Sequence, residues 1–346
     1  MQNKIKNKIN KELARSLCNL EKTYSLRKAS PLLSKAIKEL VLGKGKRLRP
    51  ALFIIGYLGF AKTPAAGLYK TAVSFELLHD FFLVHDDIVD KADKRRGKPA
   101  MHKSFDNYLK NASSAKFNGQ DLAIIAGDVL YALAIESFLS IKEDAKLKQK
   151  ALQNFLKAAI STTTGEFIEL LSGLKGIEKI SSEDIYKIYD YKTARYTFAS
   201  PLSCGAILGG ANKKEIDRLY RYGIYLGRAF QIKDDVLGMF GEEKETGKPA
   251  LTDLQEAKKT ILLWHAYNNS GKEYKSAIKK ILSKDKIDRS DLLKMREIIS
   301  ASGTLDFAGD EIIHFTRKAK TIIKSLKMHP RYKELLGSYS RQLLTL

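Results

Sequence analysis

The sequence has 346 residues, of which 44% are hydrophobic and 29% are charged, and its formal net charge is +22. This apolar content exceeds that of a disordered chain and is enough for a large buried core. The seven prolines form no linker that divides the chain, so we expect a single domain over residues 1–346.

We expect neither a membrane span nor a secretion signal. No apolar run reaches the roughly 18 to 20 residues that span a bilayer, and the N-terminus lacks the apolar centre of a secretion signal. The two cysteines, Cys18 and Cys204, indicate no disulfide framework, which favours a reducing cytoplasm. The positive charge would attract nucleic acid, anionic lipid or a polyanionic metabolite. Because the lysines are scattered along the whole chain, an ordinary solvated surface is the favoured interpretation.

Helical periodicity dominates the chain. Apolar residues recur at intervals of three and four residues in five segments, which in chain order are residues 36–43, 69–90, 122–143, 151–173 and 218–240. Alternating patterns typical of strands are scarce. We therefore expect an all-α protein in which many helices pack around a common core.

A basic segment, GKGKRLRP, covers residues 43–50. It concentrates four cations between glycines and a proline: Lys44, Lys46, Arg47 and Arg49. That spacing can form an anion nest. An ordinary basic loop before a helix explains the same pattern, so the segment alone does not decide between them.

The predicted helix over residues 69–90 ends in a row of carboxylates. On a continuous helix one stripe would contain His79, Phe82, Asp86, Asp90 and Asp93, with Asp87 beside it. Like charges four residues apart repel each other, so a purely structural helix would avoid this row unless a cation offset it. If the row faces a cavity it predicts Mg²⁺, because this hard cation takes oxygen ligands and shares them with phosphate. A solvated helix face is the alternative for the acidic row on its own.

Two arginines, Arg95 and Arg96, follow this row. Their planar guanidinium groups suit phosphate oxygens, and we expect Gly97 and Pro99 to end the helix there. Carboxylates that bind a metal and arginines that bind phosphate would fit one diphosphate ligand.

The predicted helix over residues 218–240 repeats this arrangement. Gln231, Asp234 and Asp235 recur at helical steps just after an aromatic residue. Downstream, Lys248 stands in a turn between glycine and proline and could reach the rim of the same site. An ordinary surface turn is the alternative interpretation of Lys248.

Together with AGDVLYALA and YKTARYTFASPL, these segments resemble the trans-isoprenyl diphosphate synthases, the polyprenyl synthetase family of isoprenoid biosynthesis. The resemblance covers most of the chain. It implies an all-α, single-domain bundle of mostly antiparallel helices around a central apolar cavity, and usually a homodimer. It also implies a prenyltransferase that condenses isopentenyl diphosphate with allylic diphosphates of C5 to C15, with no nucleic-acid partner.

The resemblance further implies roles for single residues. The isopentenyl diphosphate site would comprise Lys46, Arg49, His79 and Arg96. The ligands of Mg²⁺, at three ions per active site, would be Asp86, Asp87, Asp90 and Asp234. The allylic diphosphate would be contacted by Arg95, Lys192 and Lys248, and the residues bordering the reacting carbons would be Thr193 and Gln231.

One position departs from the family pattern. Gly238 stands where the commoner second acidic motif has a third aspartate. Because Asp234 and Asp235 remain, we expect retained activity at a weaker metal affinity.

Phe81 and Phe82 precede Asp86 by five and four residues, which is about one helical turn, or ~5.4 Å. If the aspartates bind the diphosphate, the hydrocarbon tail points toward these rings. The resemblance implies that residues here limit the length of the product, and paired phenylalanines favour C15, with C20 next. Ordinary core packing is the alternative.

Three other functions compete with this interpretation. A class I terpene cyclase also ionises allylic diphosphates, but it needs no isopentenyl diphosphate site. A basic protein that binds nucleic acid or a membrane surface would explain the net charge and leave both acidic clusters unexplained. A catalytically idle partner subunit becomes plausible only if Gly238 is disabling.

Overall fold

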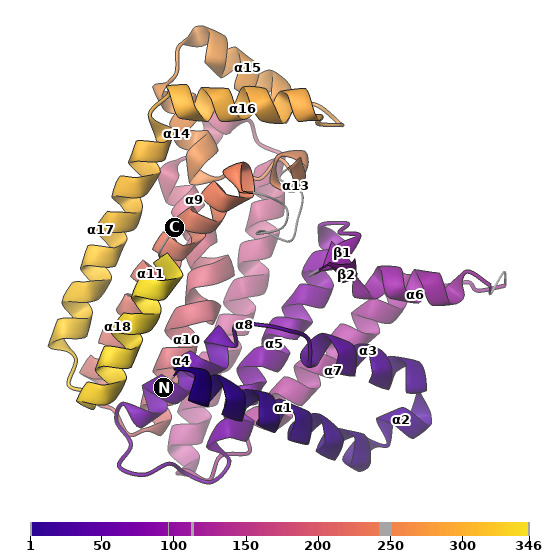
Figure 1. Cartoon of the computed structure of the whole chain (residues 1–346), viewed down its shortest axis with the longest axis vertical. Helices are drawn as coiled ribbons and strands as arrows, with labels where there is room; N and C mark the ends of the chain where they lie inside the picture. Colours follow the sequence, from indigo (N-terminus) through magenta and orange to yellow (C-terminus); the bar gives the residue numbers. More distant parts are fainter. Residues whose placement is uncertain (1, 96, 112–113, 242–250, 345–346) are drawn as a thin grey trace. The chain divides into compact units, whose positions relative to one another are not determined.

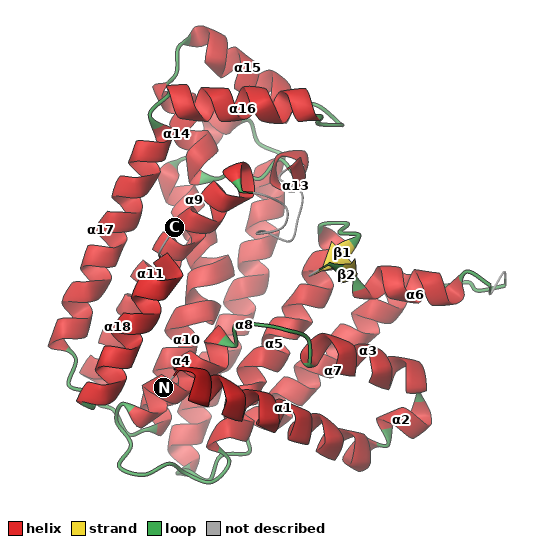
Figure 2. Cartoon of the chain, in the orientation of Figure 1, coloured by secondary structure: helices red, strands yellow, loops and turns green. Residues whose placement is uncertain are grey.

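A computed structural model describes residues 2–95, 97–111, 114–241 and 251–344. Within those residues the chain is almost entirely helical, and a two-stranded hairpin is its one sheet (Figure 2). The prediction of an all-α fold is therefore confirmed. The chain divides into two compact units: the first comprises Met1–Gln153, Pro201–Asn212 and His329–Leu335, and the second comprises Asn154–Ser200, Lys213–Met328 and Leu336–Leu346. Compact units need not be independent domains, so the single domain over residues 1–346 stays a prediction.

The first unit holds the N-terminal helices and the hairpin. Its elements are α1 (Gln2–Tyr24), α2 (Leu26–Ala29), α3 (Pro31–Val41), α4 (Leu48–Leu58), α5 (Leu68–Val89), β1 (Lys94–Arg95), β2 (Lys98–Pro99), α6 (Met101–Leu109) and α7 (Gly119–Phe138). Three further helices contribute residues to both units: α8 (Ala145–Gly173), α10 (Ser200–Leu208) and α18 (Pro330–Leu344).

Helix α5 is the centre of the first unit. It lies along α7 and also packs against α4 and α1 (Figure 1). Its residues are buried on nearly every side, as expected for a helix that is apolar around most of its circumference. The ring of Phe75 lies 5.1 Å from that of Phe53 on α4 and 6.1 Å from that of Phe138 on α7, measured between centroids. These aromatic contacts fix the helix that carries the first acidic row.

The second unit holds the remaining elements. They are η1 (Ile177–Lys179), α9 (Ser182–Tyr189), η2 (Asp190–Ala199), α11 (Lys213–Phe240), α13 (Leu251–Gln255), α14 (Ile261–Asn269), α15 (Lys272–Leu282), α16 (Arg289–Ala301) and α17 (Thr304–Ser325). Helix α11 packs against both η2 and α17. It carries the second acidic motif.

The segment η2 is a π-helix, a rare conformation that is frequent at functional sites. Glycines on its neighbours allow it to lie close to them. A Cβ atom at Gly227 of α11 would lie 2.5 Å from the Cα of Ala194, and one at Gly165 of α8 would lie 2.6 Å from the backbone nitrogen of Lys192. The backbone of η2 is therefore held between α8 and α11.

All five predicted helices are present, but the end of α5 differs from the expectation. The helix stops at Val89 because Lys91 adopts a left-handed backbone with φ of 52°. Asp93 consequently lies beyond the helix and off the acidic stripe, and its carboxylate lies 3.1 Å from the Nζ of Lys103. The expectation that Gly97 and Pro99 end this helix is also wrong. They belong to the hairpin of β1 and β2, in which Gly97 has φ of 77°.

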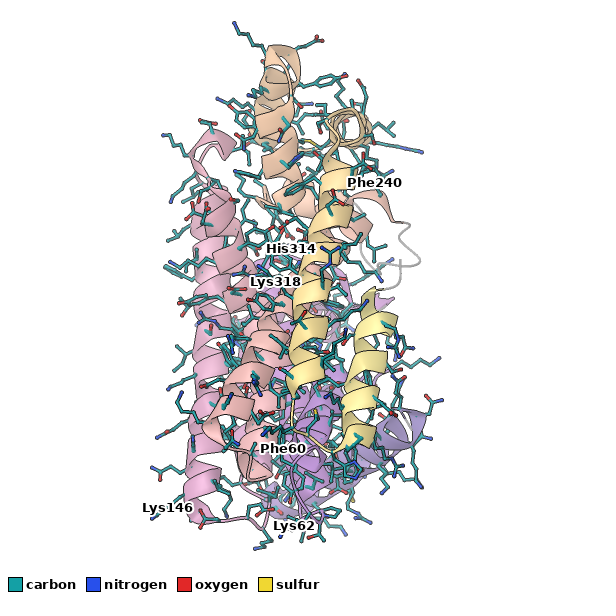
Figure 3. The ribbon with its side chains drawn as sticks, turned by 90° about the vertical axis from the view of Figure 1, so that its left-hand side faces the viewer. Phe60, Lys62, Lys146, Phe240, His314 and Lys318 are labelled. Carbon is teal, nitrogen blue, oxygen red and sulfur yellow. The ribbon has the colours of Figure 1, made fainter. Side chains whose placement is uncertain are left out.

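The described helices include none that is both long and apolar enough to cross a membrane. The lysines labelled in Figure 3, Lys62, Lys146 and Lys318, are all exposed. Cys204 is buried in the first unit, whereas Cys18 is exposed, and neither is in a disulfide.

Candidate active site

The predicted isopentenyl diphosphate residues that the structure describes all lie in the first unit. Lys46 is exposed in the basic loop between α3 and α4, which we define as residues 42–47, and Arg49 is half-buried in the first turn of α4. His79 is half-buried on α5. Arg47, which the anion-nest interpretation grouped with these cations, does not fit that interpretation: its side chain is buried and points away from solvent, toward Glu76 of α5 at 2.6 Å.

The first acidic row is built at the C-terminal end of α5. Asp86 and Asp90 are half-buried and Asp90 caps the helix, whereas Asp87 is 3% exposed. Asp87 accepts a hydrogen bond of 2.8 Å from the Nε of Arg95 and forms an ion pair with its terminal nitrogen. The hairpin thus returns Arg95 to the helix, and places a predicted diphosphate contact against a predicted metal ligand.

These carboxylates fit Mg²⁺ that is shared with a substrate. Asp86 and Asp90 are one turn apart at the negative end of the α5 dipole, where a cation would be favourable. Among the described residues no group of three metal-binding side chains forms a ready-made cage. Mg²⁺ commonly takes only one or two carboxylates and completes its shell with water and substrate phosphates, so the donor set suits an ion that arrives with a diphosphate.

An aromatic cluster precedes the acidic row on α5. Phe82 is 4% exposed and Phe81 is half-buried. The Phe81 ring lies 5.1 Å from that of Phe82, 4.6 Å from that of His85 and 5.1 Å from that of Tyr131 on α7, measured between centroids. The two phenylalanines therefore form one apolar surface, backed by a tyrosine that the sequence did not single out.

In the second unit a chain of hydrogen bonds joins η2, α11 and α14. Thr193 donates its hydroxyl to the Oε1 of Gln231 at 2.8 Å, and the Nε2 of Gln231 donates to the Oδ1 of Asp235 at 3.0 Å. The hydroxyl of Tyr189 donates to the other carboxylate oxygen of Asp235 and accepts a bond of 2.9 Å from the N–H of Ile261. The two predicted residues Thr193 and Gln231 are thereby brought together.

The adjacent aspartates of the second motif have different environments. Asp234 is exposed on α11, whereas Asp235 is 7% exposed and bound inside the unit. Burial, followed by the negative charge of Asp235, raises the pKa of Tyr189 well above its usual range, so the phenol stays a hydrogen-bond donor. Tyr189 was not predicted from sequence. The sequence places Tyr189 about one helical turn before Lys192, but no sequence pattern indicates that its hydroxyl bonds to Asp235.

Lys192 lies between two carboxylates of α8. Its Nζ is 2.6 Å from Glu166 and also pairs with Glu169. At the start of η2, Asp190 accepts two hydrogen bonds of 2.7 Å from the guanidinium of Arg228 on α11. The π-helix is therefore anchored on both sides, and its predicted diphosphate contact is already paired with negative charge. Glu166 was not predicted, because a lone glutamate on a helix gives no signal of its partner.

Two predicted residues, Arg96 and Lys248, lie outside the described residues. Gly238, where the family pattern has an aspartate, is half-buried within α11.

Comparison with known proteins identifies one family. A family model described as polyprenyl synthetase matches residues 30–299. A short chain isoprenyl diphosphate synthase of Methanocaldococcus jannaschii is 32% identical over 272 residues, which cover 78% of this chain and 77% of that protein. A geranylgeranyl diphosphate synthase of Saccharolobus solfataricus is 32% identical over 269 residues, covering 77% and 76%. A crystal structure of geranylgeranyl pyrophosphate synthase from Corynebacterium glutamicum, complexed with isoprenyl diphosphate and magnesium, superposes with a TM-score of 0.89 at 26% identity and 99% coverage of both chains.

The network around Asp235 predicts the effect of removing one hydroxyl. Tyr189→Phe would leave both the carboxylate of Asp235 and the N–H of Ile261 without this partner inside the protein. We expect the free energy of unfolding to fall by about 1–3 kcal/mol, measured by urea denaturation. Tyr108→Phe, at an exposed tyrosine of α6, is the control and should change it by less than about 0.5 kcal/mol. Equal effects of the two substitutions would contradict the network.

Proposed function

Since the chain belongs to the polyprenyl synthetase family, the trans-isoprenyl diphosphate synthases, we propose that it condenses isopentenyl diphosphate with allylic diphosphates of C5 to C15. The product would be a short-chain all-trans prenyl diphosphate. The observation that carries the proposal is the C-terminal end of α5, where Asp86, Asp87 and Asp90 are gathered and Arg95 returns to Asp87. Negative and positive groups in contact at one helix end suit a ligand that is itself a metal-bound anion.

The diphosphate of the allylic substrate would be bound by charge. Mg²⁺ held by Asp86, Asp87, Asp90 and Asp234 would neutralise the departing diphosphate, and we keep three ions per site as part of the proposal. Three cations would contact the same diphosphate directly: Arg95, Lys192 and Lys248. Since Arg95 and Lys192 are paired with carboxylates in the protein alone, substrate binding would exchange these partners for phosphate oxygens.

The reaction needs no nucleophilic side chain. The allylic carbon–oxygen bond breaks and its electron pair leaves with the diphosphate. The double bond of isopentenyl diphosphate then forms the new carbon–carbon bond, and the released diphosphate takes the proton that restores a double bond. Thr193 and Gln231, locked together by their hydrogen bond, would border the reacting carbons, while apolar walls exclude the water that would quench the cation.

The length of the product would be set by the aromatic cluster on α5. Phe81 and Phe82 support C15 as the main product, because two large rings one turn before Asp86 shorten the space for the tail. The name of the similar Saccharolobus solfataricus protein speaks for C20, which we place second. Tyr131 behind Phe81 adds to the obstruction.

We also propose a homodimer. Along α8, Ile160, Phe167 and Leu171 are exposed and recur at steps of seven and four residues, so they share one uncharged face, and the exposed Leu174 directly follows the helix. An apolar face of this kind is typical of an interface.

Light scattering tests the homodimer and should give a particle of twice the chain mass of 38.9 kDa. Phe167→Lys should halve the measured mass, whereas Ile313→Lys on α17 should leave it unchanged. If the protein without substitutions has the mass of one chain, the proposed homodimer is wrong.

We propose a cytoplasmic location because neither cysteine is in a disulfide, which suits a reducing compartment. No nucleic-acid partner is proposed. The exposed lysines labelled in Figure 3 lie on separate elements, as an ordinary charged surface would have them.

A product assay tests the proposed function. The purified chain is incubated with Mg²⁺, labelled isopentenyl diphosphate and each of the C5, C10 and C15 allylic diphosphates, and products are separated by chromatography. We expect a C15 or C20 prenyl diphosphate whose formation stops when EDTA removes the metal. Cyclised hydrocarbon from the allylic substrate alone would identify a cyclase, and no product with any primer would reject the proposal.

The aromatic cluster predicts a change in product length. Phe81→Ala combined with Phe82→Ala removes both rings, so the product should lengthen by at least one C5 unit. The control is Phe105→Ala, which removes a ring as buried as that of Phe82 from α6 in the same unit and should leave the product unchanged. An unchanged product in a folded double variant would show that these rings are ordinary core.

A further inference from the structure

Arg47 lies in the loop between α3 and α4, and its side chain donates four hydrogen bonds. Its Nε donates to Asn10 of α1 at 3.0 Å, and its Nη1 donates to Glu76 of α5 at 2.6 Å. Its Nη2 donates to two backbone carbonyls, those of Val41 at 3.0 Å and Gly43 at 2.6 Å. One guanidinium therefore joins α1, the end of α3, the basic loop and α5.

The ion pair of Arg47 and Glu76 is buried, with both side chains 3% exposed. Burying two charges removes them from water, and an apolar pair of similar volume often serves stability as well. The backbone of Arg47 is also left-handed, with φ of 53°, a conformation that is unfavourable for a residue other than glycine. Stability alone is therefore a poor explanation of this arrangement, whereas a fixed geometry explains it.

The pair lies between the two pieces of chain that carry the proposed isopentenyl diphosphate contacts. Arg47 directly follows Lys46 and is two residues before Arg49. Glu76 is three residues before His79 on α5, so the two share one face of the helix one turn apart. The covalent path between the loop and His79 runs through all of α4 and much of α5, whereas the ion pair links the loop to α5 directly.

We propose that Arg47 and Glu76 are positioning residues that set the separation between Lys46 and Arg49 on one side and His79 on the other. This inference rests on the proposed function, because it assigns those three residues to isopentenyl diphosphate. Neither Arg47 nor Glu76 touches the substrate. They hold the basic loop at a fixed height over α5, so that three donors meet one diphosphate.

An arginine is required for this role by geometry. Its planar fork reaches acceptors in several directions at once, as the four bonds show, whereas a lysine presents one nitrogen on a flexible stem. Arg47→Lys keeps the positive charge beside Glu76 and loses the links to the loop carbonyls. It therefore separates the charge of the residue from its positioning.

The experiment measures the KM of each substrate, the dissociation constant of isopentenyl diphosphate and the hydrogen exchange of the basic loop. In Arg47→Lys, the KM for isopentenyl diphosphate and its dissociation constant from calorimetry should rise roughly 10- to 100-fold, as expected for misplaced binding groups. The KM for the allylic diphosphate should change less than about twofold, because that site rests on other residues. In the unliganded variant, the amides of the basic loop should exchange hydrogen faster. If this variant does not fold, Glu76→Gln retains an oxygen acceptor for Arg47 and should show the same pattern more weakly.

A matched control is Arg228→Lys, which disturbs the two-pronged ion pair with Asp190 in the second unit. It should leave the dissociation constant of isopentenyl diphosphate unchanged. An unchanged constant in Arg47→Lys, or an equal rise in both KM values, would overturn the positioning role. Absence of turnover in the unchanged protein would overturn the proposed function instead, and the calorimetric binding of isopentenyl diphosphate would still decide the positioning.

Discussion

A buried carboxylate is stable when a donor or a cation satisfies it, and this constraint acts on the candidate site residues of each unit. In the first unit Glu76 is held by Arg47, and Asp87 is held by Arg95. In the second unit Asp235 is held by Tyr189 and Gln231. Each of these carboxylates is held by a residue outside its own helix, so the acidic helices are anchored at the same points that carry the proposed chemistry.

The anchored carboxylates stand beside others that are more accessible. Asp87 is buried between the half-buried Asp86 and Asp90, and the buried Asp235 follows the exposed Asp234. Each acidic motif looks uniform in sequence, but its aspartates fall into two kinds. Some are buried and bonded within the protein, and others are accessible to a ligand. This division supports the prediction that activity is retained despite Gly238. The second motif already assigns one aspartate to the interior and keeps another at the surface.

The sequence predicted the helical architecture well because long apolar periodicity reports which face of a helix is buried. It also identified both acidic motifs and the family. The sequence could not show which of two adjacent residues points inward. Arg47 was grouped with Lys46, but Arg47 is buried because it pairs with Glu76, which is 29 residues away. The end of α5 was placed too late for a similar reason, because the left-handed backbone of Lys91 is a local conformation that hydrophobic periodicity does not report.

The π-helix is the clearest element that the sequence did not reveal. Its width depends on close approach by α8 and α11, which Gly165 and Gly227 permit, and glycine alone does not announce such packing. Two residues of η2 were expected to act on the substrate, and both have their partners on other helices: Lys192 pairs with Glu166 and Glu169 of α8, and Thr193 bonds to Gln231 of α11. The local pattern therefore indicated the proposed site residues, and only the packing shows which side chains hold them in place.

The account assigns Asp234 to Mg²⁺ binding and Asp235 to the stability of the fold. A Mg²⁺ titration of two variants separates these two roles. Turnover is measured against Mg²⁺ concentration, and unfolding against urea, for Asp234→Asn and Asp235→Asn. We expect Asp234→Asn to raise the half-saturating Mg²⁺ concentration by roughly tenfold or more with little change in stability. Asp235→Asn should lower the free energy of unfolding by about 1–3 kcal/mol, because its buried donors lose a charged acceptor. Loss of stability in Asp234→Asn, with Asp235→Asn as stable as the unchanged protein, would contradict the account.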